Sequence, residues 1–200
     1  MIRNQAQKSV RYIGFIAIIL VIGFVTSMPK NWHFWDLSRF EANTLTANSK
    51  EVISNLDQKI HVKNYVNILH PHGRLGTPKW RKFDLKQFDQ YTRYIPDMEM
   101  EYIYFYDHVP MYADSSVNIK EKAQKAAIAH GVEMDQVLAP EEIKKIVNLA
   151  PEHNAYVRFV HHGKDSVVLR MFMDAVGYPS ESEITSALKR LYTNVPVVGF

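Results

Sequence analysis

The feature that most constrains this chain is a charge-free, largely apolar stretch of 18 residues from Tyr12 to Pro29. As an α-helix with a rise of about 1.5 Å per residue it would reach roughly 27 Å, close to the roughly 30 Å hydrocarbon core of a bilayer. Residues 1–11 carry three basic and no acidic side chains. The pattern therefore predicts a cytoplasmic tail (1–11), a transmembrane helix (12–29) and an extracytoplasmic remainder, in a single-pass protein of the inner (cytoplasmic) membrane. The expected membrane-anchor residues are Ile13, Phe15, Ile16, Ile19, Leu20, Ile22 and Phe24.

A cleaved signal peptide is the alternative interpretation of the same stretch. Val25-Thr26-Ser27 is an acceptable small-residue cleavage site after a short apolar core. Trp32 and Trp35 just beyond the stretch favour an uncleaved segment held at a membrane interface. Both interpretations place residues 30–200 outside the cytoplasm.

The charge of the remaining chain argues against nucleic-acid binding. The net charge of +3 resides in residues 1–11, and the rest holds 21 basic and 21 acidic residues. Without an excess of basic residues, the main electrostatic argument for nucleic-acid binding is lost. The absence of cysteine excludes disulfides, thiol redox chemistry and a Cys nucleophile.

The order of hydrophobic patterns predicts one α/β domain over residues 30–193. We expect strands at residues 60–69, 98–106, 155–161 and 166–173. A helix between the first two makes them parallel, and the turn at 162–165 makes the last two antiparallel. A mixed four-stranded sheet with helices on both faces satisfies this order, which is that of a thioredoxin-like domain without its dithiol.

Local signals predict the helix boundaries and the connections. We expect a basic loop from His70 to Lys82, followed by a helix that Asp84 caps. Asn118, Pro140 and Ser180 are expected to begin three further helices. Residues 194–200 look like the first strand of another α/β unit, so the sequence predicts a truncated second domain there.

Two segments carry a resemblance to a known family. The first segment, residues 36–57, contains the motifs Asp36-Leu37-Ser38, Thr44-Leu45-Thr46, Ser49-Lys50-Glu51 and Leu56-Asp57. The second segment runs from Ser180 to Leu191. At this spacing they resemble auxiliary proteins of an ABC-type transport system of the gliding-motility GldG type. The chain lacks the Gly-His-Gly loop that follows in that family.

The resemblance implies a non-enzymatic, membrane-anchored extracytoplasmic accessory component that contacts an ABC permease and ATPase. Membrane lipid is a further expected partner, a homo- or hetero-oligomer is possible, and no cofactor is implied. The alternative is a periplasmic binding module for a glycan, a peptide or an anionic ligand. The sequence contains no Walker-type phosphate loop and no enzyme signature.

The basic loop is the best candidate site in the sequence. Its cations and its tryptophan could contact an anion, lipid headgroups or a partner: Arg74, Lys79, Trp80, Arg81 and Lys82. A solvated loop is the simpler alternative. His70 and His72 alternate in the same loop, but two histidines alone do not make a metal site, and no metal is expected. Tyr102, Tyr104 and Tyr106, together with Tyr112, lie at strand spacing as packing residues would, with a glycan or peptide platform as the less favoured interpretation.

Overall fold

The structure, a computed structural model, describes residues 2–28, 35–39, 43–109, 118–152, 156–169 and 178–193, with side chains from residue 11 onward. The chain divides into two compact units, Met1–Ala42 and Asn43–Phe200. The strand predicted at residues 194–200 lies outside the described residues.

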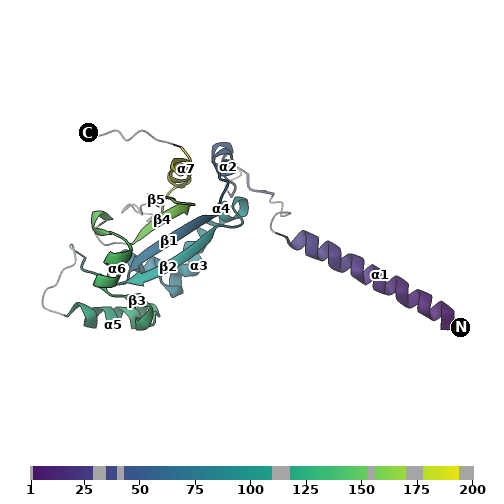
Figure 1. Cartoon of the computed structure of the whole chain (residues 1–200), viewed down its shortest axis with the longest axis horizontal. Coiled ribbons are helices and arrows are strands. Elements are labelled where there is room, and N and C mark those ends of the chain that lie inside the picture. Colours follow the sequence, from purple (N-terminus) through teal and green to yellow (C-terminus); the bar gives the residue numbers. More distant parts are fainter. Residues whose placement is uncertain are drawn as a thin grey trace. The chain divides into compact units, whose positions relative to one another are not determined.

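The first unit contains helix α1 (Ile2–Ser27) (Figure 1). Its large apolar side chains from Tyr12 to Phe24 are each 53–69% exposed. Near its end, the hydroxyl of Thr26 donates to the carbonyl of Ile22 at 2.9 Å and that of Ser27 to the carbonyl of Gly23 at 2.6 Å. The helix ends at Ser27, two residues before Pro29. Proline disfavours the helical backbone conformation in the residue that precedes it, which is consistent with this end point.

The described part of the chain contains no helix that is both long enough and apolar enough to cross a membrane. This finding contradicts the transmembrane helix predicted at residues 12–29 and the single-pass location in the inner membrane. The predicted anchor residues instead lie exposed along α1: Ile13, Phe15, Ile16, Ile19, Leu20, Ile22 and Phe24.

The second unit is built on a mixed five-stranded sheet in the order β3-β2-β1-β4-β5 (Figure 1). Strand β1 lies at the centre, parallel to β2 and antiparallel to β4. At the edges, β3 runs parallel to β2 and β5 runs antiparallel to β4. The strands are β1 (Ile60–Asn67), β2 (Glu99–Phe105), β3 (Val137–Leu138), β4 (Val157–His162) and β5 (Asp165–Leu169).

The predicted α/β class, the parallel first pair and the antiparallel last pair are confirmed. The predicted four-stranded sheet is wrong, because β3 adds a fifth strand beside Tyr104 and Phe105. Strand β3 has only two residues, which are too few to show an alternating hydrophobic pattern, so the sequence did not predict it. The predicted thioredoxin-like fold class is therefore corrected to an α/β unit with a mixed five-stranded sheet, without a membrane-spanning helix in the described residues.

Helices pack on both faces of this sheet. Ile60 and Val62 of β1 pack against α2, α4 and α7 in one buried cluster. Tyr65 of β1 and Phe105 of β2 point to the other face, where they pack with Ile143 of α6. The helices are α2 (Ala47–Ser54), α3 (Pro78–Lys86), α4 (Asp89–Tyr94), α5 (Ile119–His130), α6 (Pro140–Ile146) and α7 (Glu181–Arg190). Three short 3₁₀ helices accompany them: η2 (Pro71–Gly76), η4 (Met134–Gln136) and η5 (Ala150–Glu152).

The predicted starts of three helices are confirmed. The side chain of Asn118 accepts from the backbone N–H of Lys120 at 2.9 Å at the start of α5, and Pro140 occupies the first turn of α6. At α7 the carboxylate of Glu183 accepts from the backbone N–H of Ser180 at 2.6 Å, which closes a capping box.

Candidate functional site

The segment predicted as a basic loop is largely helical. Residues 71–76 form η2, and α3 begins at Pro78, directly after Thr77. The Thr77 hydroxyl donates to the carbonyl of Arg74 at 2.6 Å and joins the two elements. Proline suits the first helical position because its fixed φ is helical and its missing N–H is not needed there.

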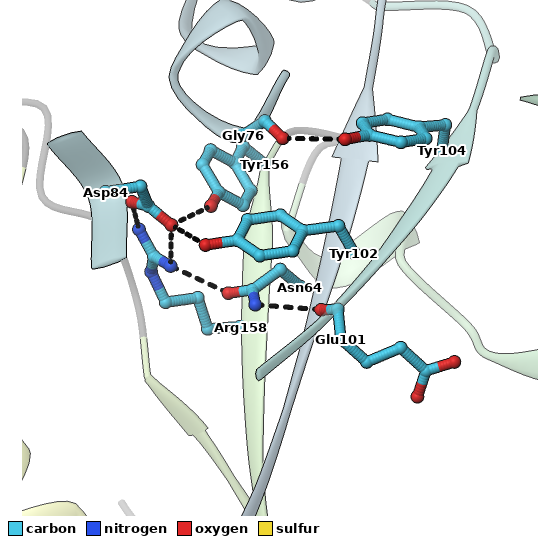
Figure 2. Close-up of polar contacts among 8 residues, drawn as sticks. All are labelled: Asn64, Gly76, Asp84, Glu101, Tyr102, Tyr104, Tyr156 and Arg158. Atoms are coloured by element: carbon cyan, nitrogen blue, oxygen red, sulfur yellow. Dashed lines mark hydrogen bonds and ion pairs between the residues drawn. The ribbon is translucent and has the colours of Figure 1, made fainter. Parts of the chain in front are cut away.

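Asp84, predicted as a helix cap, instead lies within α3 and faces the sheet. Its side chain and that of Arg158 on β4 are both 0% exposed, and they form a two-point ion pair. One guanidinium nitrogen of Arg158 donates to Asp84 Oδ2 at 2.9 Å and to Asn64 Oδ1 at 2.7 Å. Figure 2 shows this pair at the centre of a polar network between α3 and strands β1, β2 and β4.

Two tyrosines complete the hydrogen bonding of Asp84. The hydroxyls of Tyr102 and Tyr156 donate to Asp84 Oδ2 at 2.6 and 3.2 Å (Figure 2). Burial alone would raise the pKa of Asp84, but the hydrogen bonds and charge of Arg158 outweigh it, so the pKa is lowered. Burial and the Asp84 charge raise the pKa of Tyr102, which keeps its hydroxyl proton available for donation.

Aromatic rings surround the guanidinium of Arg158. Its central carbon lies 4.8 Å from the ring centroid of Tyr156, 5.0 Å from that of Phe88 and 5.7 Å from that of Tyr178. Such contacts stabilise a cation that has left water. This network holds α3 to the sheet and is closed to solvent, so we assign it a structural role.

The outward side of α3 has the opposite character. Asp84 is the only acidic residue of α3 and also its only buried residue, so all the exposed charged side chains of the helix are positive. Lys79, Lys82 and Lys86 are exposed and, at spacings of three and four, share one face of the helix. Trp80 and Phe83 beside them are 41% and 49% exposed.

The exposed rings and cations of this region touch one another. Trp80 and Phe83 meet edge to face at 6.4 Å between ring centroids, and the guanidinium of Arg74 lies 5.7 Å from the Trp80 ring. We call this set the α3 surface: Arg74, Lys79, Trp80, Lys82, Phe83 and Lys86. Of the five residues predicted from sequence, four belong to it.

Arg81, the fifth predicted residue, points away from the α3 surface. Its guanidinium donates to the hydroxyl of Tyr104 at 2.6 Å and lies 4.7 Å from the ring centroid of Tyr102. Tyr104 in turn donates to the carbonyl of Gly76 at 3.0 Å (Figure 2). Arg81 therefore packs between α3 and β2.

Phe83 and Lys86 are members of the α3 surface that the sequence interpretation missed. It ended the basic segment at Lys82 and began a new helix at Asp84. The Thr77-Pro78 pair is a helix-start signal, and a helix counted from Pro78 places Lys79, Lys82 and Lys86 on one face.

The two loop histidines interact with each other. His70 is buried, and its Nδ1 accepts from the backbone N–H of His72 at 3.1 Å. Burial and the nearby His72 lower the pKa of His70. Among the described residues, no three His, Asp or Glu side chains converge on a position for a metal ion.

The alternating tyrosines of β2 are packing residues. Tyr102 and Tyr104 lie beneath α3, and Tyr106 is buried with Tyr104 in a cluster that includes Ala123 of α5. Tyr112 lies outside the described residues. These contacts leave Tyr102, Tyr104 and Tyr106 unsuited to a glycan platform.

The fold and this site define a class of protein, an α/β unit on a mixed five-stranded sheet with an exposed basic and aromatic helix. No family model, curated protein or solved structure matches the chain. The α3 surface and the sequence resemblance are the two observations that bear on the function.

Proposed function

We propose that this chain is a non-enzymatic docking protein that binds a partner through the α3 surface. We further propose that it serves as an accessory component of an ABC-type transport complex of the gliding-motility kind, with the permease and ATPase subunits as partners. The resemblance around Thr44-Leu45-Thr46 and Ser180 to Leu191 supports the choice of complex. The α3 surface supports docking as the mode of action.

One observation carries the docking proposal: α3 directs its single acid inward and its three lysines, Trp80 and Phe83 outward. A helix whose function was only to cover the sheet would have apolar residues on its inner face. Here the inner face uses an ion pair, while Trp80 and Phe83 remain exposed. Exposed aromatic residues beside cations are typical of interaction sites, where Trp, Tyr and Arg are enriched.

The chemistry of the α3 surface specifies its partner. Carboxylates would complement the charges of Lys79, Lys82 and Lys86, and no ion pair joins these lysines to another described residue. The Trp80 and Phe83 rings require an apolar side chain to pack on them. An acidic protein segment with interspersed apolar residues satisfies both requirements.

Crosslinking tests the proposal in the intact complex. A photoreactive phenylalanine at position 83, in the full chain produced with its permease and ATPase, should crosslink to a transporter subunit. The same residue at position 128 is the matched control, because Ile128 on α5 is 82% exposed but lies outside the α3 surface. Equal crosslinking from both positions, or none from position 83, would contradict docking through α3.

Charge reversal provides a second, independent readout. Lys79→Glu with Lys82→Glu should abolish co-purification with the transporter subunits, because like charges would then face each other. Lys120→Glu with Lys125→Glu on α5 reverses the same number of exposed charges and should leave co-purification intact.

A further inference from the structure

Strand β5 is an edge of the sheet, and among the described residues no strand pairs with its outer side. It pairs with β4 in a hairpin in which His162 faces Asp165 across the turn at Gly163 and Lys164. In a hairpin with a two-residue turn, the closing residues exchange both backbone hydrogen bonds, and bonded pairs then alternate along the strands.

This alternation identifies the backbone groups at the open edge. Val167 and Leu169, like Asp165, direct their N–H and C=O groups toward β4. Ser166 and Val168 must then direct theirs away from β4. Open groups of this kind are a template for another strand.

A groove lies along this edge, between β5 and α7. Its volume is about 460 Å³. The residues of α7 that line it recur at spacings of one, three and four, so they share one side of the helix. The lining residues are Val167, Val168, Leu169, Ser182, Glu183, Ser186 and Arg190.

The dimensions of the groove suit an extended chain. Helix α7 has 10 residues, which at about 1.5 Å each gives a wall of roughly 15 Å. Four or five residues of a strand, at about 3.3 Å each, have a similar length. Val167 and Val168, which line the groove and are partly exposed, provide apolar contact beside such a strand.

The charges of the groove specify one more feature of its ligand. Glu183 is already engaged at the start of α7, where it accepts from the N–H and the hydroxyl of Ser180. Arg190 at the other end of the helix is exposed and forms no ion pair with another described residue. A ligand carboxylate would provide its counter-charge.

We infer that the groove between β5 and α7 binds an extended peptide segment, which adds to β5 as a further strand and places an acidic group against Arg190. Backbone pairing at Ser166 and Val168 gives affinity, and the apolar contacts and Arg190 give selectivity. This site is separate from the α3 surface and does not depend on the function proposed for it.

A displayed library of random twelve-residue peptides, selected against the full chain, tests the inference. Selected peptides should alternate apolar β-branched with polar residues and carry an acidic residue near one end. In their presence, the amide protons of Ser166 and Val168 should exchange more slowly with solvent. A selection that yields no binder, or binders without this pattern, would overturn the inference.

Matched variants locate the binding. Arg190→Glu should lower the affinity for the selected peptides by at least about tenfold, because repulsion between two carboxylates replaces a charge-assisted hydrogen bond. Lys189→Glu is the control, since Lys189 is also exposed and does not line the groove. Equal affinity of both variants would reject the contact with Arg190.

Val168→Pro tests the backbone pairing. Proline removes the outward N–H of residue 168 but spares the bonds that Val167 and Leu169 make to β4. Binding should be lost while the thermal unfolding midpoint stays near that of the unmodified chain. If Val168→Pro unfolds the domain, slower amide exchange at Ser166 and Val168 of the unmodified chain on peptide binding is the test of backbone pairing.

Other occupants would give different results. Protection of Ser166 and Val168 that rises with protein concentration in the absence of peptide would show edge-to-edge pairing of two copies and overturn the peptide assignment. Loss of peptide binding in the Lys79→Glu/Lys82→Glu variant, with Arg190→Glu unaffected, would move the peptide site to α3.

Discussion

Asp84 of α3 and Arg158 of β4 form an ion pair from which solvent is completely excluded, with an oxygen–nitrogen distance of 2.9 Å on one side of the pair. The two residues lie far apart in the sequence. Their pairing holds the middle of α3 to the sheet, so the outward lysines and rings keep a fixed position. The first two predictions concern this pair.

Replacing Asp84 by Asn should lower the free energy of unfolding by about 3–5 kcal/mol, because the guanidinium of Arg158 would remain buried without a counter-charge. Urea denaturation measures the change. The double variant Asp84→Leu/Arg158→Met removes both charges and should lose less than the single variant. If the free energy of unfolding of Asp84→Asn lay within about 1 kcal/mol of that of the unmodified chain, a structural role for the pair would be contradicted.

Acid should remove the contribution of Asp84. Its pKa is lowered in the folded state, so its stabilisation is fully present above the unfolded value of about 3.9. That stabilisation is lost as the pH falls through the lower folded pKa. The unmodified chain should therefore lose more stability below pH ~4 than Asp84→Leu/Arg158→Met does. Parallel losses in urea titrations across this range would refute the assignment.

Glu181 joins the start of α7 to the start of α2. Its carboxylate accepts from the backbone N–H of Thr46 at 2.9 Å, from the Thr46 hydroxyl at 2.8 Å and from the hydroxyl of Ser49. Glu181→Ala should cost about 1–3 kcal/mol in the free energy of unfolding, because Ser49 is buried and loses this acceptor. Glu181→Gln keeps one oxygen and should cost less. Equal stability of both variants in chemical denaturation would count against this contact.

Gly73 is required by the close packing of η2 on the end of β1. A Cβ atom added at this position would lie 2.0 Å from the backbone oxygen of Asn67. Gly73→Ala should therefore destabilise the second unit by about 1–3 kcal/mol or more. Gly14→Ala is the control, since a Cβ there meets no atom within 4 Å. The measurement is the thermal unfolding midpoint. An unchanged midpoint for Gly73→Ala would contradict the prediction, because it would mean that η2 can move away from β1 at little cost.

The elements predicted correctly from the sequence have short-range causes. Asn118 and Ser180 cap helices through contacts with residues two or three positions away, and such spacing is visible in the sequence. The hairpin of β4 and β5 is equally local. The parallel pairing of β1 with β2 follows from the helices between them.

The errors concern features that depend on distant residues. Asp84 has the sequence surroundings of a helix cap, and its true partner Arg158 lies 74 positions away. Strand β3 is recognisable only because β2 lies beside it. The start of α3 is marked locally by Thr77-Pro78, but the cap-like surroundings of Asp84 favoured a later start. For the α3 surface, the sequence predicted three of the four cations and Trp80, but not Phe83, Lys86 or the helix that presents them.

The central place of β1 determines when this sheet can form during synthesis. Residues of β1 are made early, but one of their two neighbouring strands is β4, near the end of the described chain. On the ribosome, β1 and β2 can pair first and leave one flank of β1 without hydrogen bonds. The nascent chain therefore carries an exposed strand until Val157–His162 has left the exit tunnel, and it is during this interval that a chaperone would protect it.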